Sequence, residues 1–325
     1  MQRIVIKKAI EMVITIFIAT IIIFVLIRLS PSNPAKIIAL RQDTATTNTV
    51  IFDEKYEELR ERFELNKSIP QQYIMWLKRV FSLDFGNSFY TNIPVKEEIL
   101  KRIPATFLLT LPALAIEIFI GVIFGTISAI NNKKITDKVI RFFSVVFSST
   151  PAFAISLMLV YFFGVHKNIF KITNDASIER LWLPSITLAI IQAPMLIRMI
   201  RMLLLDEFGK TYIGFGLTRG LGRKWVIKNA FKNMLIPLIS IISLTFVSLI
   251  GGAVIIESVF TWPGIGKYVL DSVLVQDYPV VQAYSLIMVC LITFSNFLTD
   301  LSYVFIDPKI RLRKVKMKNK NEKQK

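Results

Sequence analysis

The sequence predicts an all-α integral membrane protein with six transmembrane helices. Of its 325 residues, 53% are hydrophobic, yet the formal net charge is +17. Soluble globular domains interleave apolar and charged residues to build one core, whereas here the apolar residues form continuous blocks. Each block reaches the roughly 20 residues needed to cross the hydrocarbon of a bilayer. An outer-membrane barrel is excluded because its strands would alternate apolar and polar residues.

Six blocks define the expected transmembrane helices, at 9–29, 105–130, 139–164, 181–204, 235–260 and 280–306. The first block is longer than the core of a signal peptide and has no small-residue cleavage site after it, so we expect it to be retained. The segments between and around the blocks complete the expected organisation: an N-terminus at 1–8, an external segment at 30–104, a core of five helices at 105–306 that contains a basic connector at 206–234, and a basic tail at 307–325.

The external segment is expected to be partly helical. Residues 53–65 are charged and periodic, and residues 71–80 are amphipathic. The segment is interpreted either as a platform for a partner protein or as a solvated lid on the helix ends.

The distribution of Lys and Arg predicts the orientation. The N-terminus, the 131–138 turn, the 206–234 connector and the tail are all basic. They alternate with the connectors near 165–180 and 261–279, which hold few basic residues, and with the long 31–104 segment, which is charge-balanced. The positive-inside rule places the basic side, and with it both termini, in the cytoplasm. The same placement accounts for the positive charge without nucleic acid, because anionic headgroups lie at these membrane edges.

Motifs for catalysis are absent from the sequence. It contains no G-x-x-x-x-G-K-[ST] loop, no H-E-x-x-H, and no histidine suited to a catalytic triad. The single Cys290 excludes an internal disulfide, and the single His166 cannot form a metal site alone. We therefore expect no enzyme activity, metal or cofactor in this chain, and another chain must supply any energy it uses.

The connector at 206–234 is the expected attachment point for that other chain. It is basic and amphipathic, and Gly220 and Gly222 are expected to divide it into two helices. The alternative is an interfacial helix that rests on anionic lipid.

Several motifs carry a resemblance to a known family. The connector contains RGLG at 219–222, NAFKN at 229–233 and LIP at 235–237. It resembles the cytoplasmic "EAA" loop of the permease subunits of binding-protein-dependent ABC importers. Further motifs are similar to the dipeptide, oligopeptide and nickel branch of that family: LSPSNP at 29–34, DFGNS at 84–88, RIPAT at 102–106, ESVF at 257–260, WPGIG at 262–266, DYP at 277–279 and DPKIR at 307–311.

Two departures from the family pattern stand out. Gly214, Phe215 and Gly216 occupy the acidic-Ala-Ala positions of the loop, and Ser32 and Asn33 replace the Gly-Asp of the first motif. Glycines make the loop helix intrinsically looser, by about 1 kcal/mol each relative to alanine.

The resemblance implies a type I importer permease in the cytoplasmic membrane. Its implied partners are a second permease subunit, giving a heterodimer, two cytoplasmic ATPase subunits and an extracytoplasmic substrate-binding protein. The implied cargo is di- or oligopeptides, with nickel or a metal–metallophore complex as the alternative on the same scaffold. A secondary transporter or a membrane enzyme is a more distant alternative, which the missing inverted halves and catalytic residues disfavour.

Site residues carried over from the resemblance fall into two sets. Those expected to couple to the ATPase are Tyr212, Leu217, Arg219, Gly220 and Leu221. Those expected to form an external gate are Trp262, Pro263, Gly264 and Gly266.

Polar residues within the apolar blocks form a third set of candidates, because an ionisable group is costly in hydrocarbon and is expected to face the bundle interior, a partner or water. They are Glu117, Gln192, Glu257 and Asp300, with Glu11 and Arg198 nearby. Prolines 112, 151, 184 and 194 are expected to interrupt their helices. Gly121 and Gly125 form a G-x-x-x-G step that predicts a close helix contact.

Overall fold

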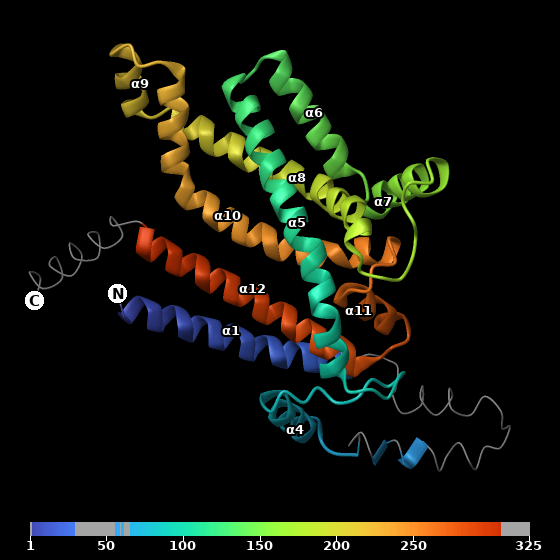
Figure 1. Ribbon diagram of the computed structural model, residues 1–325. Helices are drawn as coiled ribbons and strands as arrows, with labels where there is room; N and C mark the ends of the chain where they lie inside the picture. Colours follow the sequence, from blue (N-terminus) through green and yellow to red (C-terminus); the bar gives the residue numbers. More distant parts are fainter. Residues whose placement is uncertain (1, 30–55, 59, 62–65, 307–325) are drawn as a thin grey trace, which may run out of the picture.

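Figure 1 shows a computed structural model of the chain, which describes residues 2–29, 56–58, 60–61 and 66–306. The predicted all-α class is confirmed for these residues, in which strand pairing is limited to one isolated bridge between Asn87 and Pro94. In chain order the helices are α1 (Gln2–Arg28), α4 (Ile69–Phe81), α5 (Val95–Ile130), α6 (Ile135–Ser149), α7 (Ala152–Val160), the π-helix η1 (Tyr161–His166), α8 (Ile178–Phe208), α9 (Thr211–Thr218), α10 (Arg223–Val259), α11 (Ile265–Leu274) and α12 (Tyr278–Ile306).

Some sequence predictions fall outside the described residues. They are most of the LSPSNP motif, most of the helix expected at 53–65, and the basic tail at 307–325 with its DPKIR motif. The amphipathic stretch expected at 71–80 is described, and it lies within α4.

Among the described residues, five helices are long and apolar enough to cross a membrane, namely α1, α5, α8, α10 and α12, and a bent pair of helices gives a sixth candidate span. The third predicted span, at 139–164, is not one continuous helix. It is divided between α6 and the α7–η1 pair, which meet at a bend of 95°. Proline causes this break, because Pro151 lacks the N–H that would continue α6 and pushes Thr150 into an extended conformation, with φ −85° and ψ 130°.

The other three prolines do not divide their helices into separate elements, as Pro151 does. Pro112 lies inside continuous α5, and Pro184 and Pro194 lie inside continuous α8. Neighbouring helices can satisfy the backbone groups that a proline leaves free. Ser185 Oγ of α8 donates a hydrogen bond of 3.3 Å to the carbonyl of Leu109, in the turn that precedes Pro112.

The α5–α8 contact is the most extensive helix pair in the described part of the chain, and the predicted G-x-x-x-G step lies in it. A Cβ atom on Gly121 would lie 2.6 Å from Leu196 Cγ, and one on Gly125 would lie 2.9 Å from Ile200 Cβ. The two glycines therefore allow a backbone approach that any side chain would prevent, which confirms the predicted contact.

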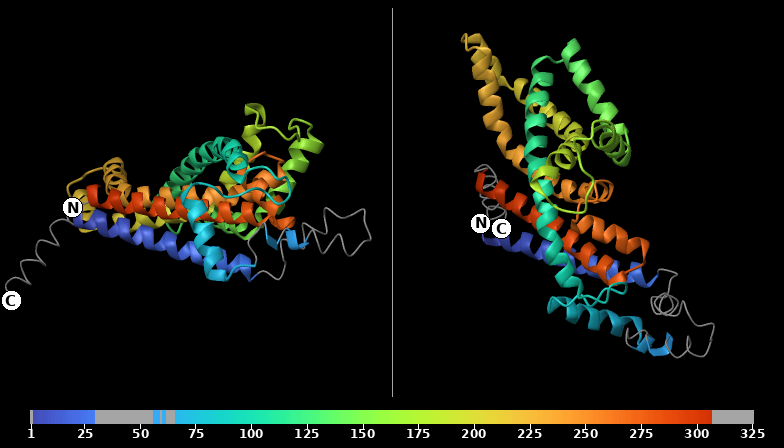
Figure 2. Two further views of the ribbon diagram at one scale, coloured as in Figure 1. Left: turned by 90° about the horizontal axis from the view of Figure 1, so that it is seen from below. Right: turned by 45° about the vertical axis from the view of Figure 1, so that its right-hand side comes forward.

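The core is arranged along the length of the bundle. One cluster, which includes Leu188, Leu249 and Phe260, joins α5, η1, α8 and α10 on the side of α11. A second, which includes Leu204 and Met234, joins α5, α8 and α10 on the side of α9. We refer to these two extremities as the α11 end and the α9 end of the bundle. α1 and α12 lie side by side at the periphery (Figures 1 and 2).

Candidate functional site

The α9 end carries the predicted coupling connector. α9 is a short helix between two long ones, as the glycines predicted, and Gly220 lies in the turn that leads to α10. Gly220 has φ +78°, and a Cβ atom there would meet nothing within 4 Å. The position therefore favours glycine for its left-handed backbone and not for lack of space.

A polar cluster fixes α9 against its neighbours. The buried carboxylate of Glu207, at the end of α8, accepts a hydrogen bond of 2.8 Å from the Tyr212 hydroxyl and pairs with Lys210. Asn233 of α10 donates to the Tyr212 oxygen at 2.8 Å. Partial burial and then the Glu207 hydrogen bond raise the pKa of Tyr212, so the hydroxyl stays protonated as a donor. Of the predicted coupling residues, Tyr212 is thus engaged inside the subunit.

The other predicted coupling residues are exposed. Leu217 and Leu221 are 54% and 37% exposed, and Arg219 and Gly220 lie between them. Phe215, which was not among the predicted coupling residues, is the most exposed apolar side chain of α9 at 67%. An apolar group of this kind on a rigid helix is typical of a protein contact surface. We call Phe215, Leu217, Arg219 and Leu221 the α9 surface.

Gly216 has a local structural explanation. A Cβ atom at this position would lie 2.2 Å from Cζ3 of Trp225, the aromatic ring that α10 packs onto α9. The alanine of the family pattern would therefore collide with Trp225. Gly214, by contrast, has open space at its Cβ position, and nothing in its surroundings requires glycine.

A second polar cluster at the α9 end was missed by sequence reasoning. Buried Asp137 of α6 accepts hydrogen bonds from Ser128 Oγ at 2.5 Å, from the Lys133 backbone at 3.0 Å and from Arg201 Nε at 2.8 Å. A buried carboxylate needs this many partners to offset its lost hydration. Since Arg223 also donates to the carbonyl of Ile130 at 3.0 Å, the α5–α6 turn is joined to both α8 and α10.

The α11 end brings together residues that the sequence placed in separate sets. The buried carboxylate of Glu257, predicted as an intramembrane polar group, accepts hydrogen bonds from Thr106 Oγ1 at 2.6 Å and from the Lys267 backbone at 3.0 Å. Thr106 Oγ1 in turn accepts from the Ile265 backbone at 2.9 Å. Glu257 and Thr106 therefore hold the first turn of α11, where the N–H groups have no partner within the helix.

The predicted gate motif is folded around this carboxylate. The Trp262 ring is fully buried, and its Nε1 donates to the carbonyl of Ala105 at 2.8 Å. A Cβ atom on Gly264 would lie 2.2 Å from the Glu257 carboxyl carbon, and one on Gly266 would lie 2.7 Å from Val254 Cα. Pro263 is half-buried between them. We call Glu257, Thr106 and residues 262–266 the α11 latch.

The DFGNS and DYP motifs also meet at this end. Ser88 Oγ donates to Asp277 at 2.5 Å, and the Phe89 backbone donates to the same carboxylate at 2.9 Å. Arg102 stacks 4.3 Å from the Tyr268 ring centroid, and burial raises the pKa of Tyr268 to about 12. Asp277 therefore attaches the segment before α5 to the start of α12, and Arg102 attaches α5 itself to α11.

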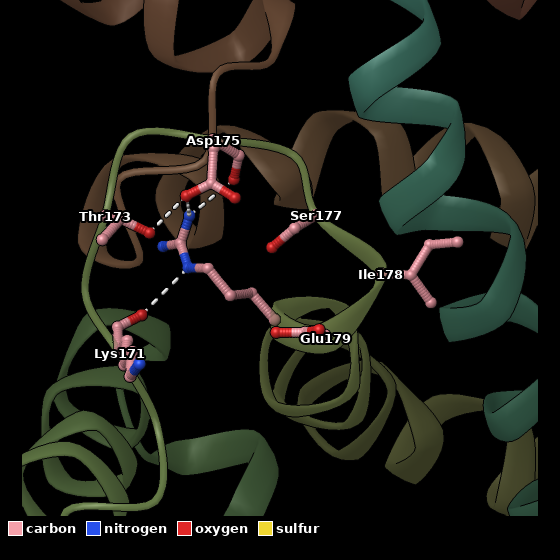
Figure 3. Close-up of a pocket in the computed structure, with 7 residues that line it drawn as sticks. Lys171, Thr173, Asp175, Ser177, Ile178 and Glu179 are labelled. Atoms are coloured by element: carbon pink, nitrogen blue, oxygen red, sulfur yellow. Dashed lines mark hydrogen bonds and ion pairs between the residues drawn. The ribbon is translucent and has the colours of Figure 1, made fainter.

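Arg180, in the first turn of α8, forms hydrogen bonds at the α11 end. Its guanidinium donates to the carbonyls of Lys171 at 2.9 Å, Asp175 at 2.5 Å and Phe260 at 2.8 Å. A surface cavity of about 460 Å³ borders this group; Figure 3 shows Asp175 and Thr173 on one side of it and Ile178 on the other. Through these hydrogen bonds to backbone carbonyls, Arg180 attaches the 167–177 loop to the end of α10.

The remaining intramembrane polar candidates do not gather into one site. Glu117 is buried, and its Oε2 has no hydrogen-bond partner among the described residues. Gln192 donates to Ser248 Oγ at 3.0 Å, between α8 and α10. Asp300 is half-exposed and pairs with Lys8 at 3.0 Å across α1 and α12, so of the expected surroundings it has an exposed one and not the bundle interior. Glu11 pairs with the same lysine at 2.9 Å.

Comparison with known proteins gives matches over nearly the whole chain. Residues 121–312 match the family described as binding-protein-dependent transport system inner membrane component, and residues 1–110 match the N-terminal family of the same membrane components. A probable peptide ABC transporter permease protein, y4tP of Sinorhizobium fredii, is 30% identical over 316 residues, which cover 94% of this chain and 98% of the relative. The glutathione transport system permease protein GsiC of Escherichia coli is 29% identical over 314 residues, which cover 96% and 100%.

Proposed function

Because this chain belongs to the family of binding-protein-dependent transport system inner membrane components, we propose that it forms half of the path by which an ATP-driven importer carries short peptides across the membrane. The names of the relatives support this class of cargo, since glutathione is itself a tripeptide. Those relatives align with this chain almost from end to end, so the proposal does not depend on a shared fragment.

The observation that carries the proposal of ATP-driven transport is the α9 surface. It presents exposed Phe215 and Leu217 on a helix that Glu207 and Asn233 fix to α8 and α10. A surface attached in this way moves only with the long helices. The chain has no phosphate-binding loop, so we propose that an ATPase subunit binds the α9 surface and transmits its closure to α8 and α10.

The assembly we propose contains four further subunits. A second, non-identical permease completes the path, two ATPases bind at the α9 ends, and a substrate-binding protein delivers cargo at the α11 end. In this arrangement the α9 end and both termini are cytoplasmic. The α11 latch then lies near the outer mouth, where Trp262 and the two close-packed glycines, Gly264 and Gly266, form the gate.

Uptake in whole cells tests the proposed cargo. Cells with and without this gene are compared for uptake of labelled di- and tripeptides and of nickel ions, with the gene restored from a plasmid as the control. We expect peptide uptake to depend on the gene. Loss of nickel uptake with intact peptide uptake would refute the proposed cargo while leaving the permease role in place.

A further inference from the structure

α4 is an amphipathic helix that the proposed transport path does not use. At 100° per residue all of its apolar side chains except Met75 fill one continuous arc, which includes Tyr73, Ile74, Trp76, Leu77 and Phe81. The opposite arc is polar and basic, and it contains Gln71, Lys78 and Arg79. Such a division is typical of a helix that lies between an apolar and an aqueous phase.

α1 covers only one edge of this apolar arc. Tyr73 packs edge-on against Phe24 at 5.4 Å between ring centroids, and its hydroxyl meets Thr20 Oγ1 at 2.9 Å. Trp76 packs on the same Phe24 at 5.8 Å. No described residue covers the other edge of the arc, where Ile74 is 52% exposed and Phe81 is 82% exposed.

The contacts with α1 place α4 at the border of the bilayer. Phe24 lies four residues, or ~6 Å, before the end of α1 at Arg28, and Thr20 lies ~12 Å before it. The span of α1 includes both residues. The Tyr73 ring therefore reaches into the depth of the hydrocarbon, while the axis of α4 stays near the headgroups.

The direction of α4 agrees with this placement. In Figure 1 α4 is seen nearly end-on while α1 runs across the picture, and in the left view of Figure 2 α4 stands across α1. α4 thus crosses the end of a membrane-spanning helix steeply, so it runs closer to the membrane plane than to its normal.

Positive charge surrounds the crossing. Arg28 stacks over the Phe24 ring at 5.4 Å, its Nε has no hydrogen-bond partner among the described residues, and Arg79 lies close enough for the two cations to repel each other. Lys78 is exposed on the neighbouring turn. Lipid phosphates would supply the complementary negative charge at this level.

We propose that α4 is an interfacial helix, whose Ile74, Leu77 and Phe81 enter the outer leaflet while Lys78 and Arg28 contact lipid phosphates. We assign lipid as the contact of the uncovered apolar edge of α4 because this edge lies beside the span of α1. At this depth α1 itself is exposed to the bilayer through Leu26. α4 then fixes how deeply α1 sits in the membrane.

Spin-label depth measurements on the full-length chain, purified with its partner subunits, test this proposal. Cys290 is changed to Ser, and a nitroxide is placed at Ile74→Cys, Phe81→Cys or, as the matched control on the polar arc, Gln71→Cys. Samples are reconstituted in vesicles of phosphatidylethanolamine and phosphatidylglycerol. Collision rates are measured with oxygen, which enters hydrocarbon, and with a water-soluble nickel chelate. Since all three side chains are exposed, labelling should not disturb packing; at 71 it removes one hydrogen bond, which Gln71 Oε1 accepts from the Ser68 backbone at 3.2 Å.

We expect labels at 74 and 81 to have a ratio of oxygen to nickel-chelate collisions several-fold above that of the label at 71. A ratio at 74 and 81 equal to that at 71 would place this edge in water and overturn the proposal. Low collision rates with both reagents at 74 and 81 would also overturn it, because protein would then cover this edge in place of lipid.

Discussion

Gly220 and Gly222 stand two residues apart in one exposed turn, yet only Gly220 has a backbone that disfavours a side chain. Gly220 has φ +78°, whereas Gly222 has φ −70° and ψ 168°, which any residue adopts. Neither has an atom within 4 Å of its Cβ position. Valine at 220 would make the left-handed turn less favourable by roughly 1–2 kcal/mol, so the free loop would relax and ATPase binding would have to restore it.

We therefore predict that Gly220→Val weakens association with the ATPase by roughly 5- to 30-fold, and that uptake falls with it. Gly222→Val adds the same bulk to the same turn and serves as the control, with little expected effect. Co-purification of the tagged chain with its ATPases, measured beside uptake, distinguishes the two variants. Equal behaviour of the two would mean that the left-handed turn is not needed for coupling.

Gly214 and Gly216 give a second matched pair, within α9 itself. Gly214→Ala should stabilise α9 by up to about 1 kcal/mol, because its Cβ position is open. Gly216→Ala should destabilise the contact with α10 by roughly 1–3 kcal/mol, because its Cβ atom would overlap Trp225. The midpoint of thermal unfolding of the purified protein should thus rise for the first variant and fall for the second.

Replacing the obstacle provides the control for that prediction. In a Trp225→Leu background, Gly216→Ala should lower the midpoint of unfolding less than it does in the native background. If Gly216→Ala lowers the midpoint equally in both backgrounds, Trp225 is not the reason for glycine at 216.

Individual side chains also show where sequence reasoning stops. The sequence predicted Glu257 as a candidate because an ionisable group is costly in hydrocarbon. It did not predict the partner, Thr106, which lies 151 residues away and is connected to Glu257 by no local pattern. Arg198 was singled out and is exposed, whereas Arg201, one turn later, holds Asp137. Helix rotation decides between such neighbours, and it depends on packing against other helices.

At the level of elements, the α11 latch makes a prediction about Glu257. In Glu257→Gln the amide could still accept from the Lys267 backbone, but the Thr106 hydroxyl would lose its acceptor. A buried donor without a partner costs about 1–3 kcal/mol, so α11 should detach more often. Alkylation of a cysteine at buried Ser272 of α11, in a chain with Cys290→Ser, should speed up roughly tenfold.

Thr106→Ser keeps the hydroxyl and should leave the alkylation rate unchanged. Asp300→Asn, at a half-exposed ion pair far from the latch, is a second control with no expected effect. An unchanged rate in Glu257→Gln would show that the carboxylate does not hold α11.

Prolines show how far elements could be predicted. The sequence marked Pro112 and Pro151 alike, yet α5 continues through Pro112 while the third span breaks at Pro151. Each proline lacks an N–H, so the difference lies in what surrounds it. α5 stays packed on α8 past Pro112, where Ser185 Oγ donates to the Leu109 carbonyl, whereas the break at Pro151 lets α6 pack along α8 and α7 turn away. Apolar block length predicted the spans, but only tertiary contacts decide their continuity.

In the whole molecule, α8 and α10 join two polar assemblies at opposite ends. α8 carries Arg180 at the α11 end and Arg201 with Glu207 at the α9 end. α10 begins beside Gly222 and ends at the α11 latch, which Glu257 anchors. We propose that a displacement of α9 reaches the latch through these two helices. The close contact of α8 with α5 at Gly121 and Gly125 leaves little room for independent motion of α8.

The orientation of this assembly is the last prediction, and the positions of the Lys and Arg residues carry it. The connectors of the α9 end are strongly basic, whereas the short connectors of the α11 end hold few basic residues and the long segment before α5 is charge-balanced, so the α9 end should be cytoplasmic. In a chain with Cys290→Ser, cysteines are introduced at Lys134 and Gly222 of the α9 end and at Lys171 of the α11 end, all three exposed. An impermeant thiol reagent added to bacteria with a permeabilised outer membrane should label only position 171, and labelling of 134 and 222 should require disruption of the inner membrane.

Because lysines 134 and 171 carry the same charge and both are exposed, a difference in labelling reports the side of the membrane and not the reactivity of the site. Labelling of 134 and 222 in intact inner membranes would invert the topology, and it would also remove the α9 surface from the compartment that contains ATP.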